Sequence, residues 1–321
     1  MFLFGMKLMG DGLELVAGSR LKGLLEKITS NPLLGILVGV VVTGAIQSSS
    51  ATTVMVVGFL NAGLLKLEQS VYIIMGANIG TTVTSFLIGL KINAIAPVLI
   101  FIGVIFVVFI KKKFLQHLGM VIVGFGILFT GMEGMSSAMV PLREMPAFRE
   151  LMVKFSNPVL GILAGAVLTA VIQSSSASVG ILQALALSGV IGLDSAVYVL
   201  FGQNIGTCIT AVLASIGTSR SAKRATIIHL MFNIIGTVLF TILCILFPLA
   251  DLVASFTPDA PAAQIANMHT IFNIGTTLLL LPAGNLLAGM AEHLLPDKKS
   301  ESLAAEQRKA ACKKVEDVWN S

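Results

Sequence analysis

The chain has 321 residues, of which 55% are hydrophobic and only 12% are charged, and its formal net charge is +5. With a mean hydropathy of +0.93, it lies far from the balance of a soluble domain and is typical of a polytopic membrane protein in a lipid bilayer. The basic residues stand in short loops between apolar runs, as topology signals do, so no nucleic-acid partner is expected. Three widely spaced cysteines predict neither a disulfide framework nor a zinc site.

The first part of the chain predicts three crossings and one re-entrant hairpin. A short helix covers residues 1–17, and the hairpin covers 31–65, where two apolar arms meet at a polar apex, residues 47–50. Each arm is too short to span a bilayer, so protein or water must line the apex. Residues 71–90 are long enough to cross, but Gly76-Ala77-Asn78-Ile79-Gly80-Thr81-Thr82 interrupts them, which predicts a broken helix. Residues 94–110 cross again.

The same order returns 126 positions later without a gap. The apex Gln47-Ser48-Ser49-Ser50 matches residues 173–176, Asn78 to Thr81 match residues 204–207, and 14 of the 20 residues from 31 to 50 are identical to their partners. Hydrophobic composition alone does not produce such agreement, so the halves are copies of one unit. The second copy is expected to have a helix over 118–135, a hairpin over 157–191, a broken helix over 196–217 and a helix over 225–247.

A final helix over 264–290, interrupted by Pro282, has no partner in the first copy. Because three crossings and a returning hairpin precede the second copy, that copy enters from the opposite side of the membrane. The predicted fold is therefore an all-α polytopic membrane protein with two inverted repeats, 1–113 and 114–247. An extra C-terminal transmembrane helix lies in 248–296, and residues 297–321 form a cytoplasmic tail.

The distribution of basic residues agrees with this topology. The loops assigned to the inside hold twelve Lys and Arg residues and those outside hold four, counting the start of the tail. We therefore expect a multi-pass protein of the plasma (inner) membrane with a cytoplasmic C-terminus. The sequence leaves open whether the chain forms a homodimer.

Matching short, polar segments in inverted repeats indicate a transporter site near the bilayer midplane. Each apex offers hydroxyls, an amide and the free N–H groups of a half-helix, which favour an anion. Neither hairpin, from its opening proline to Leu65 or Ile191, contains a charged residue or a histidine. A buried anion there needs positive charge from elsewhere. Neutral oxygen ligands suit Na⁺, so the sequence predicts that a small oxyanion and a cation bind together.

The paired Gln-Ser-Ser-Ser apices, the two Asn-Ile-Gly-Thr segments and His229-Leu230-Met231-Phe232-Asn233 resemble the type II sodium/phosphate cotransporter family, over about residues 3–290. The resemblance implies sodium-driven movement of inorganic phosphate, with sodium as a coupling ion and no other cofactor or metal. It implies that phosphate is bound by Gln47, Ser48, Ser49, Ser50, Gln173, Ser174, Ser175 and Ser176. It implies that sodium is bound by Gln47, Ser50, Thr52, Asn78, Thr81, Gln173, Ser176, Ser178, Asn204 and Thr207. Residues 94–110 lack the His-Asp-x-Phe-Asn-like sequence of the animal members, which leaves the stoichiometry and electrogenicity open.

Alternative substrates, transport directions and functions are also compatible with parts of this sequence. The substrate could be another small oxyanion, and bacterial relatives that resemble exporters leave the direction open. A hydrolase using the serines needs a base within reach, and the motifs hold none, so no enzyme is expected. A passive anion channel is disfavoured by occluding hairpins on both sides. Asn78 and Asn204 could instead satisfy backbone groups, and His229 and His269 fit hydrogen-bonded structure better than a metal pair.

Overall fold

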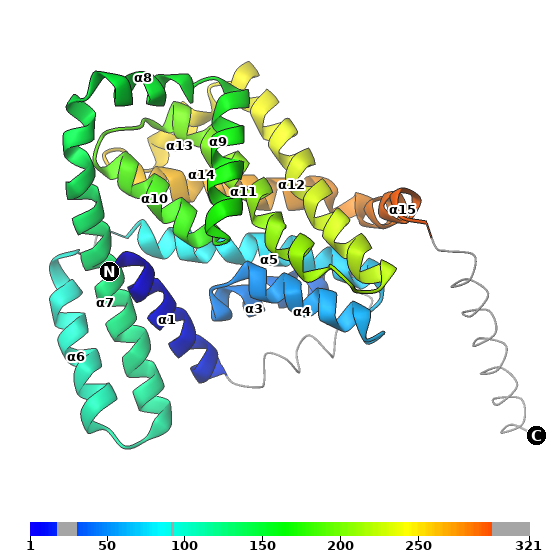
Figure 1. The fold of residues 1–321 in the computed structure, drawn as a ribbon, viewed down its shortest axis with the longest axis horizontal. Helices are drawn as coiled ribbons and strands as arrows, with labels where there is room; N and C mark the ends of the chain where they lie inside the picture. The colour runs from blue at the N-terminus through cyan, green and yellow to red at the C-terminus, as the bar shows by residue number, and fades with distance from the viewer. Residues whose placement is uncertain (18–30, 91–92, 297–321) are drawn as a thin grey trace, which may run out of the picture.

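The structure is a computed structural model that describes residues 1–17, 31–90 and 93–296 (Figure 1). These residues form helices and connections, and no strand occurs among them. Five helical segments in this described part are long and apolar enough to cross a membrane: Leu67–Ile88, Lys113–Leu142, Leu193–Ala214, Arg220–Leu246 and Pro261–Leu294. The basic loop 18–30, Lys91 and the predicted tail 297–321 lie outside the described residues.

The two copies form the same helices with the same bounds. In the first copy these are α3 (Pro32–Ile46), α4 (Ser49–Asn61) and α5 (Leu67–Ile88). Their counterparts, each shifted by 126 positions, are α9 (Pro158–Ile172), α10 (Ser175–Leu187) and α11 (Leu193–Ala214). Both α3 and α9 begin at a proline after an asparagine whose side chain caps the first turn. The two short-armed helix pairs predicted at 31–65 and 157–191 are present.

The prediction of broken helices is wrong. Both α5 and α11 run unbroken for 22 residues through their Gly-x-Asn-Ile-Gly-Thr segments. The glycines serve close packing instead: a Cβ on Gly76 would lie 2.0 Å from the Ile36 carbonyl oxygen of α3, and one on Gly202 would lie 1.9 Å from the Ile162 carbonyl oxygen of α9. Small residues allow helix backbones to approach closely in a membrane. The same sequence pattern can therefore belong to a broken helix or to a close contact between two helices.

A second group of helices lies to one side of the copies. Helix α7 (Lys113–Met139) packs against both α1 (Phe2–Ala17) and α6 (Ala96–Phe109), at the lower left of Figure 1. At a rise of about 1.5 Å per residue, the 14 residues of α6 span about 21 Å. Helix α6 is therefore shorter than the transmembrane helix predicted over residues 94–110. A 3₁₀ turn (Val140–Glu144) and α8 (Pro146–Lys154) lead from α7 to α9.

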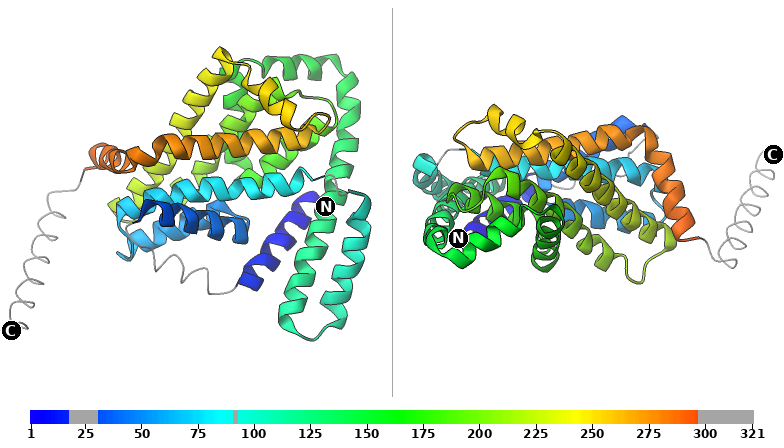
Figure 2. Two further views of the ribbon diagram at one scale, coloured as in Figure 1. Left: turned by 180° about the vertical axis from the view of Figure 1, so that it is seen from behind. Right: turned by 90° about the horizontal axis from the view of Figure 1, so that it is seen from above.

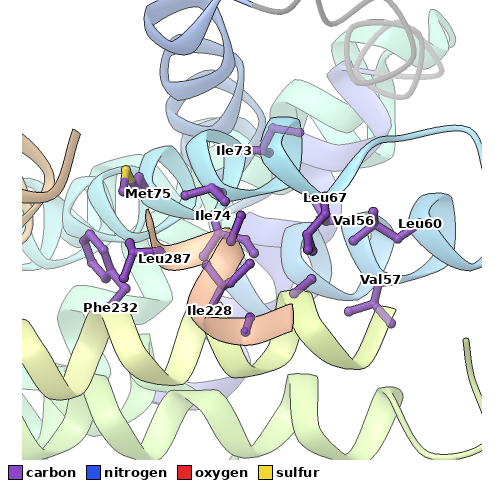
Figure 3. Packing of buried hydrophobic residues seen from close by; sticks show 14 of the residues in the cluster. Val56, Val57, Leu60, Leu67, Ile73, Ile74, Met75, Ile228, Phe232 and Leu287 are labelled. Carbon is purple, nitrogen blue, oxygen red and sulfur yellow. The ribbon is translucent and has the colours of Figure 1, made fainter. Parts of the chain in front are cut away.

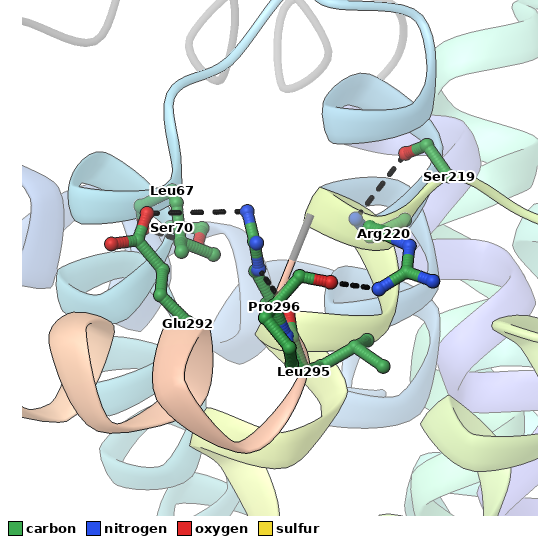
Figure 4. Close-up of polar contacts among 9 residues, drawn as sticks. Leu67, Ser70, Ser219, Arg220, Glu292, Leu295 and Pro296 are labelled. Carbon is green, nitrogen blue, oxygen red and sulfur yellow. Dashed lines mark hydrogen bonds and ion pairs between the residues drawn. The ribbon is translucent and has the colours of Figure 1, made fainter. Parts of the chain in front are cut away.

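The C-terminal part consists of α12 (Arg220–Leu246), α13 (Leu249–Phe256), α14 (Pro261–Leu280), a 3₁₀ turn (Leu281–Ala283) and α15 (Gly284–Leu294). The interruption predicted at Pro282 is confirmed. Region 248–296 is not one helix, because α13 precedes the span. Helix α15 is fixed to the start of α12, where the nearly buried Arg224 donates to the Leu295 carbonyl (3.0 Å) and lies 4.0 Å from Glu292 (Figure 4).

Two hydrophobic clusters organise the copies. The first joins Val56, Val57 and Leu60 of α4 to Ile73 and Ile74 of α5, together with residues of α12 and α15 (Figure 3). The second joins α10 and α11 to α13 and α14. The first cluster also includes Val38 and Val42 of α3. Each cluster therefore packs hairpin residues and one long helix of a single copy against helices from the C-terminal part.

Candidate functional site

Each Gln-Ser-Ser-Ser turn has one residue in the left-handed region. Gln47 and Gln173 both have φ 58°, and each donates its backbone N–H to a threonine carbonyl one turn back at 2.7 Å. Ser48 and Ser174 then cap α4 and α10 with their hydroxyls. A single left-handed residue reverses the chain, and the cap leaves the next two backbone N–H groups without an intrahelical partner. Both turns thus present hydroxyls and N–H groups at the start of a helix.

The first turn is held against α5 of its own copy. Thr84 Oγ1 donates to Gln47 Oε1 (2.8 Å), and Thr81 Oγ1 donates to Ser49 Oγ (3.1 Å). The Gln47 amide nitrogen also donates to the carbonyl of Gly44, at the end of α3. Because the Gln47 side chain bonds on both sides, its amide is oriented before any ligand arrives.

The first turn also touches the second copy. Thr210 Oγ1 on α11 lies 3.2 Å from Ser50 Oγ. Thr84 and Thr210 occupy equivalent positions of the two copies. However, Thr84 bonds to the turn of its own copy, whereas Thr210 of the second copy bonds to the turn of the first copy. Neither threonine is among the predicted site residues, although the identity of Thr84 and Thr210 in the repeat register is a signal for both.

The two hairpins differ in how their arms are joined. In the first, Thr43 Oγ1 donates to Thr52 Oγ1 (2.9 Å), so Thr52 links α3 to α4. The matching hydroxyls of Thr169 and Ser178 are buried and have no partner among the described residues. Gln173 is exposed, whereas Gln47 is half-buried. The second turn is thus the less tightly held of the two.

The asparagines of the long helices are buried near these turns. Asn78 is 3% exposed and Asn204 4%, and each donates its amide N–H to the carbonyl four residues earlier. The sequence left open whether these asparagines satisfy backbone groups or bind an ion, and these hydrogen bonds are of the first kind. The Thr207 hydroxyl likewise donates to the Gln203 carbonyl (2.9 Å). All four oxygen-bearing positions predicted on the long helices, Asn78, Thr81, Asn204 and Thr207, are buried.

Within the described ranges, no charged side chain lies among these groups. Arg224 is the one charged side chain that is buried in the described residues, and it is bound to α15. In the same part of the chain, no three His, Cys, Asp or Glu side chains gather as a metal site would need. The surroundings of the turns are therefore neutral, formed by hydroxyls, amides and backbone groups.

The structure joins the first turn to α5 and α11, and it places the second turn at the start of α10. Among the described residues, no hydrogen bond links residues 47–50 directly to residues 173–176. The link between the copies at the first turn is the contact of Ser50 with Thr210.

The family model described as Na⁺/Pi-cotransporter matches residues 1–137 and 143–256, which include both turns and both long helices. The chain belongs to this family. None of the solved structures matches the chain.

Relatives extend this result. The uncharacterized protein YqeW of Bacillus subtilis is 37% identical over 92% of this chain and 96% of its own length. The putative inorganic phosphate export protein YjbB of Salmonella typhimurium is 27% identical over 93% of this chain, which spans only 54% of that protein. The sodium-dependent phosphate transport protein 2B of Homo sapiens is 38% identical over 28% of this chain and 13% of its own length.

Proposed function

We propose that the protein is a secondary active transporter that couples Na⁺ to the movement of inorganic phosphate. The observation that carries the proposal is the pair of Gln-Ser-Ser-Ser turns, each with a left-handed glutamine, a serine cap and free helix N–H groups. Such groups suit an oxyanion. Membership of the Na⁺/Pi-cotransporter family and the names of the relatives favour phosphate as that oxyanion.

The proposed topology inverts the second copy relative to the first, with the two hairpins entering from opposite faces. Helices too short to cross support the re-entrant arms, and equal helix bounds support the duplication. The inversion itself rests on the number of crossings predicted for the first copy. Phosphate would bind to the serines and glutamines of both turns, Gln47 to Ser50 and Gln173 to Ser176. The cytoplasmic C-terminus and the homodimer stay predictions.

Sodium would be bound by neutral oxygens of the turns and of the long helices. The proposed ligands are Gln47, Ser50, Thr52, Asn78, Thr81, Gln173, Ser176, Ser178, Asn204 and Thr207. Because no cationic side chain lies beside the turns in the part of the chain that the structure describes, a bound phosphate would gain its counter-charge from the sodium ions. Each ligand therefore raises the affinity of the other, which is the physical basis of coupling.

The test is uptake of radiolabelled phosphate into proteoliposomes under an inward Na⁺ gradient, compared with an equal K⁺ gradient. Uptake is expected only with Na⁺, and Ser49→Ala or Ser175→Ala is expected to abolish it. Ser255→Ala is the matched control, since the Ser255 hydroxyl is bonded within α13 on the exposed surface. Equal uptake in Na⁺-free buffer would refute the proposal.

The exporter alternative concerns direction. The relatives named as phosphate export proteins favour it. Efflux from vesicles loaded with labelled phosphate, measured with Na⁺ inside or outside, distinguishes export from uptake. Competition by unlabelled sulfate or arsenate tests the choice of oxyanion.

A further inference from the structure

A buried histidine connects the two copies between their long helices. His269 of α14 places Nδ1 2.7 Å from Ser85 Oγ on α5, and its Nε2 lies 3.3 Å from Asn204 Oδ1 on α11. His269 and Ser85 are each 1% exposed. In addition, Gln183 of α10 donates to the carbonyls of both Ser85 and Ala262 (2.9 Å each). This junction brings together four helices, α5, α10, α11 and α14.

The hydrogen-bond partners fix the chemistry of the junction. Asn204 donates its Nδ2 to the Leu200 carbonyl, so its Oδ1 faces His269. An amide oxygen can only accept, so Nε2 carries the imidazole proton. In the neutral ring, Nδ1 is then an acceptor, and Ser85 donates to it. The Ser85 hydroxyl is buried and donates to the ring, so this contact orients the imidazole.

Helix α14 is the structural counterpart of α12. Both carry His-x-x-Phe-Asn, at 229–233 and 269–273, and in both the asparagine donates to the histidine carbonyl at 2.9 Å. Ile228 and Phe232 of α12 enter the cluster of α4 and α5, whereas Met268 and Phe272 at the same positions of α14 enter the cluster of α10 and α11. Figure 2 shows α14 lying along α5, just as α12 packs on α11. Helix α14, which has no counterpart in the register of the two copies, therefore has a structural counterpart in α12.

This equivalence makes His229 the natural comparison for His269. His229 is also 1% exposed, but neither of its ring nitrogens has a hydrogen-bond partner among the described residues. The second copy has Ala211 where the first copy has Ser85. The motif of α14 therefore forms a hydrogen-bonded bridge through His269, whereas the same motif in α12 forms none through the His229 ring among the described residues.

We propose that His269 is a positioning residue that orients the Asn204 amide for cation binding and joins both copies through Ser85. The proposal rests on the proposed function, in which Asn204 is a sodium ligand. Asn204 Oδ1 has two lone pairs; His269 binds one, which leaves the other with a fixed direction. Partners that orient a metal ligand in this way commonly contribute a factor of about 10–100 in metal affinity.

The experiment measures binding of labelled phosphate to the purified full chain as a function of Na⁺ concentration. His269→Ala is expected to raise the Na⁺ concentration for half-maximal binding about tenfold, with little change in the phosphate affinity at saturating Na⁺. His269→Gln can accept from Ser85 and donate to Asn204, so it is expected to restore most of the Na⁺ affinity. His229→Ala is the matched control and is expected to keep the wild-type Na⁺ dependence.

The outcomes separate the two proposals. If the wild-type protein binds phosphate equally without Na⁺, the proposed function fails, and the role of His269 fails with it. If wild-type binding depends on Na⁺ but His269→Ala and His229→Ala behave alike, only the role of His269 is overturned. A loss of phosphate affinity at saturating Na⁺ that equals the loss of Na⁺ affinity would indicate a general packing defect and would also overturn it. Size-exclusion profiles identify a misfolded variant. If His269→Ala misfolds, Ser85→Ala takes its place, because it removes the donor to His269 Nδ1, and an unchanged Na⁺ dependence of Ser85→Ala would overturn the role of His269.

Discussion

Replacing Gly202 with alanine tests whether the long helices are continuous and tightly packed. The added Cβ would lie 1.9 Å from the Ile162 carbonyl oxygen, whereas ordinary contact begins at 3.4 Å. Helices α9 and α11 would therefore have to separate locally by about 1.5 Å. Because the obstacle is backbone, no side-chain rotation relieves it.

The cost of such overpacking is typically about 1–3 kcal/mol. For a chain of this size, that corresponds to a fall in Tm of roughly 2–6 °C. Gly58 provides the control: it lies in α4, and a Cβ there would meet nothing within 4 Å. Gly58→Ala should be neutral or should stabilise the protein by up to about 1 kcal/mol, since alanine is the better helix former.

The assay is thermal unfolding of the detergent-purified proteins at one concentration. A Tm of Gly202→Ala equal to that of Gly58→Ala would refute the packing argument. A protein with unchanged Tm but lost phosphate transport would instead favour the broken helix predicted from the sequence, because the glycines would then be needed for an unwound binding segment.

Three further predictions follow from single contacts. Thr210→Val, which removes the contact with Ser50, should weaken Na⁺-dependent phosphate binding roughly two- to tenfold in a binding titration without changing Tm. Gln47→Gly loses the side-chain hydrogen bonds to Thr84 and Gly44 but adopts φ 58° freely, so it should lower Tm less than Gln47→Val, which loses the same bonds and is strained at this φ. Arg224→Ala should lower Tm because it removes the buried link to α15, while Glu292→Gln, at an exposed side chain, should cost at most about 1 kcal/mol by the same measurement.

The sequence predicts what depends on neighbours along the chain. The bounds of both hairpins follow from the Asn-Pro helix starts and the Gln-Ser turns, which are local signals of capping. The copies and their register follow from identity at one fixed offset. The individual site residues are implied by the family resemblance of these repeated motifs, and they stay predictions until phosphate and sodium binding are measured.

The tertiary structure decides what depends on contacts between distant segments. A Gly-x-Asn-Ile-Gly-Thr segment can unwind a helix or let two helices touch, and only the position of α3 and α9 shows the second outcome. Likewise, both His-x-x-Phe-Asn motifs have the same pattern, but a serine opposite one gives His269 a partner, whereas an alanine lies opposite the other, and the His229 ring has no hydrogen-bond partner within the described ranges. Ser85 and His269 are 184 positions apart, so their hydrogen bond has no signal in the local sequence. Helix packing, and not sequence spacing, determines which residue lies opposite the histidine.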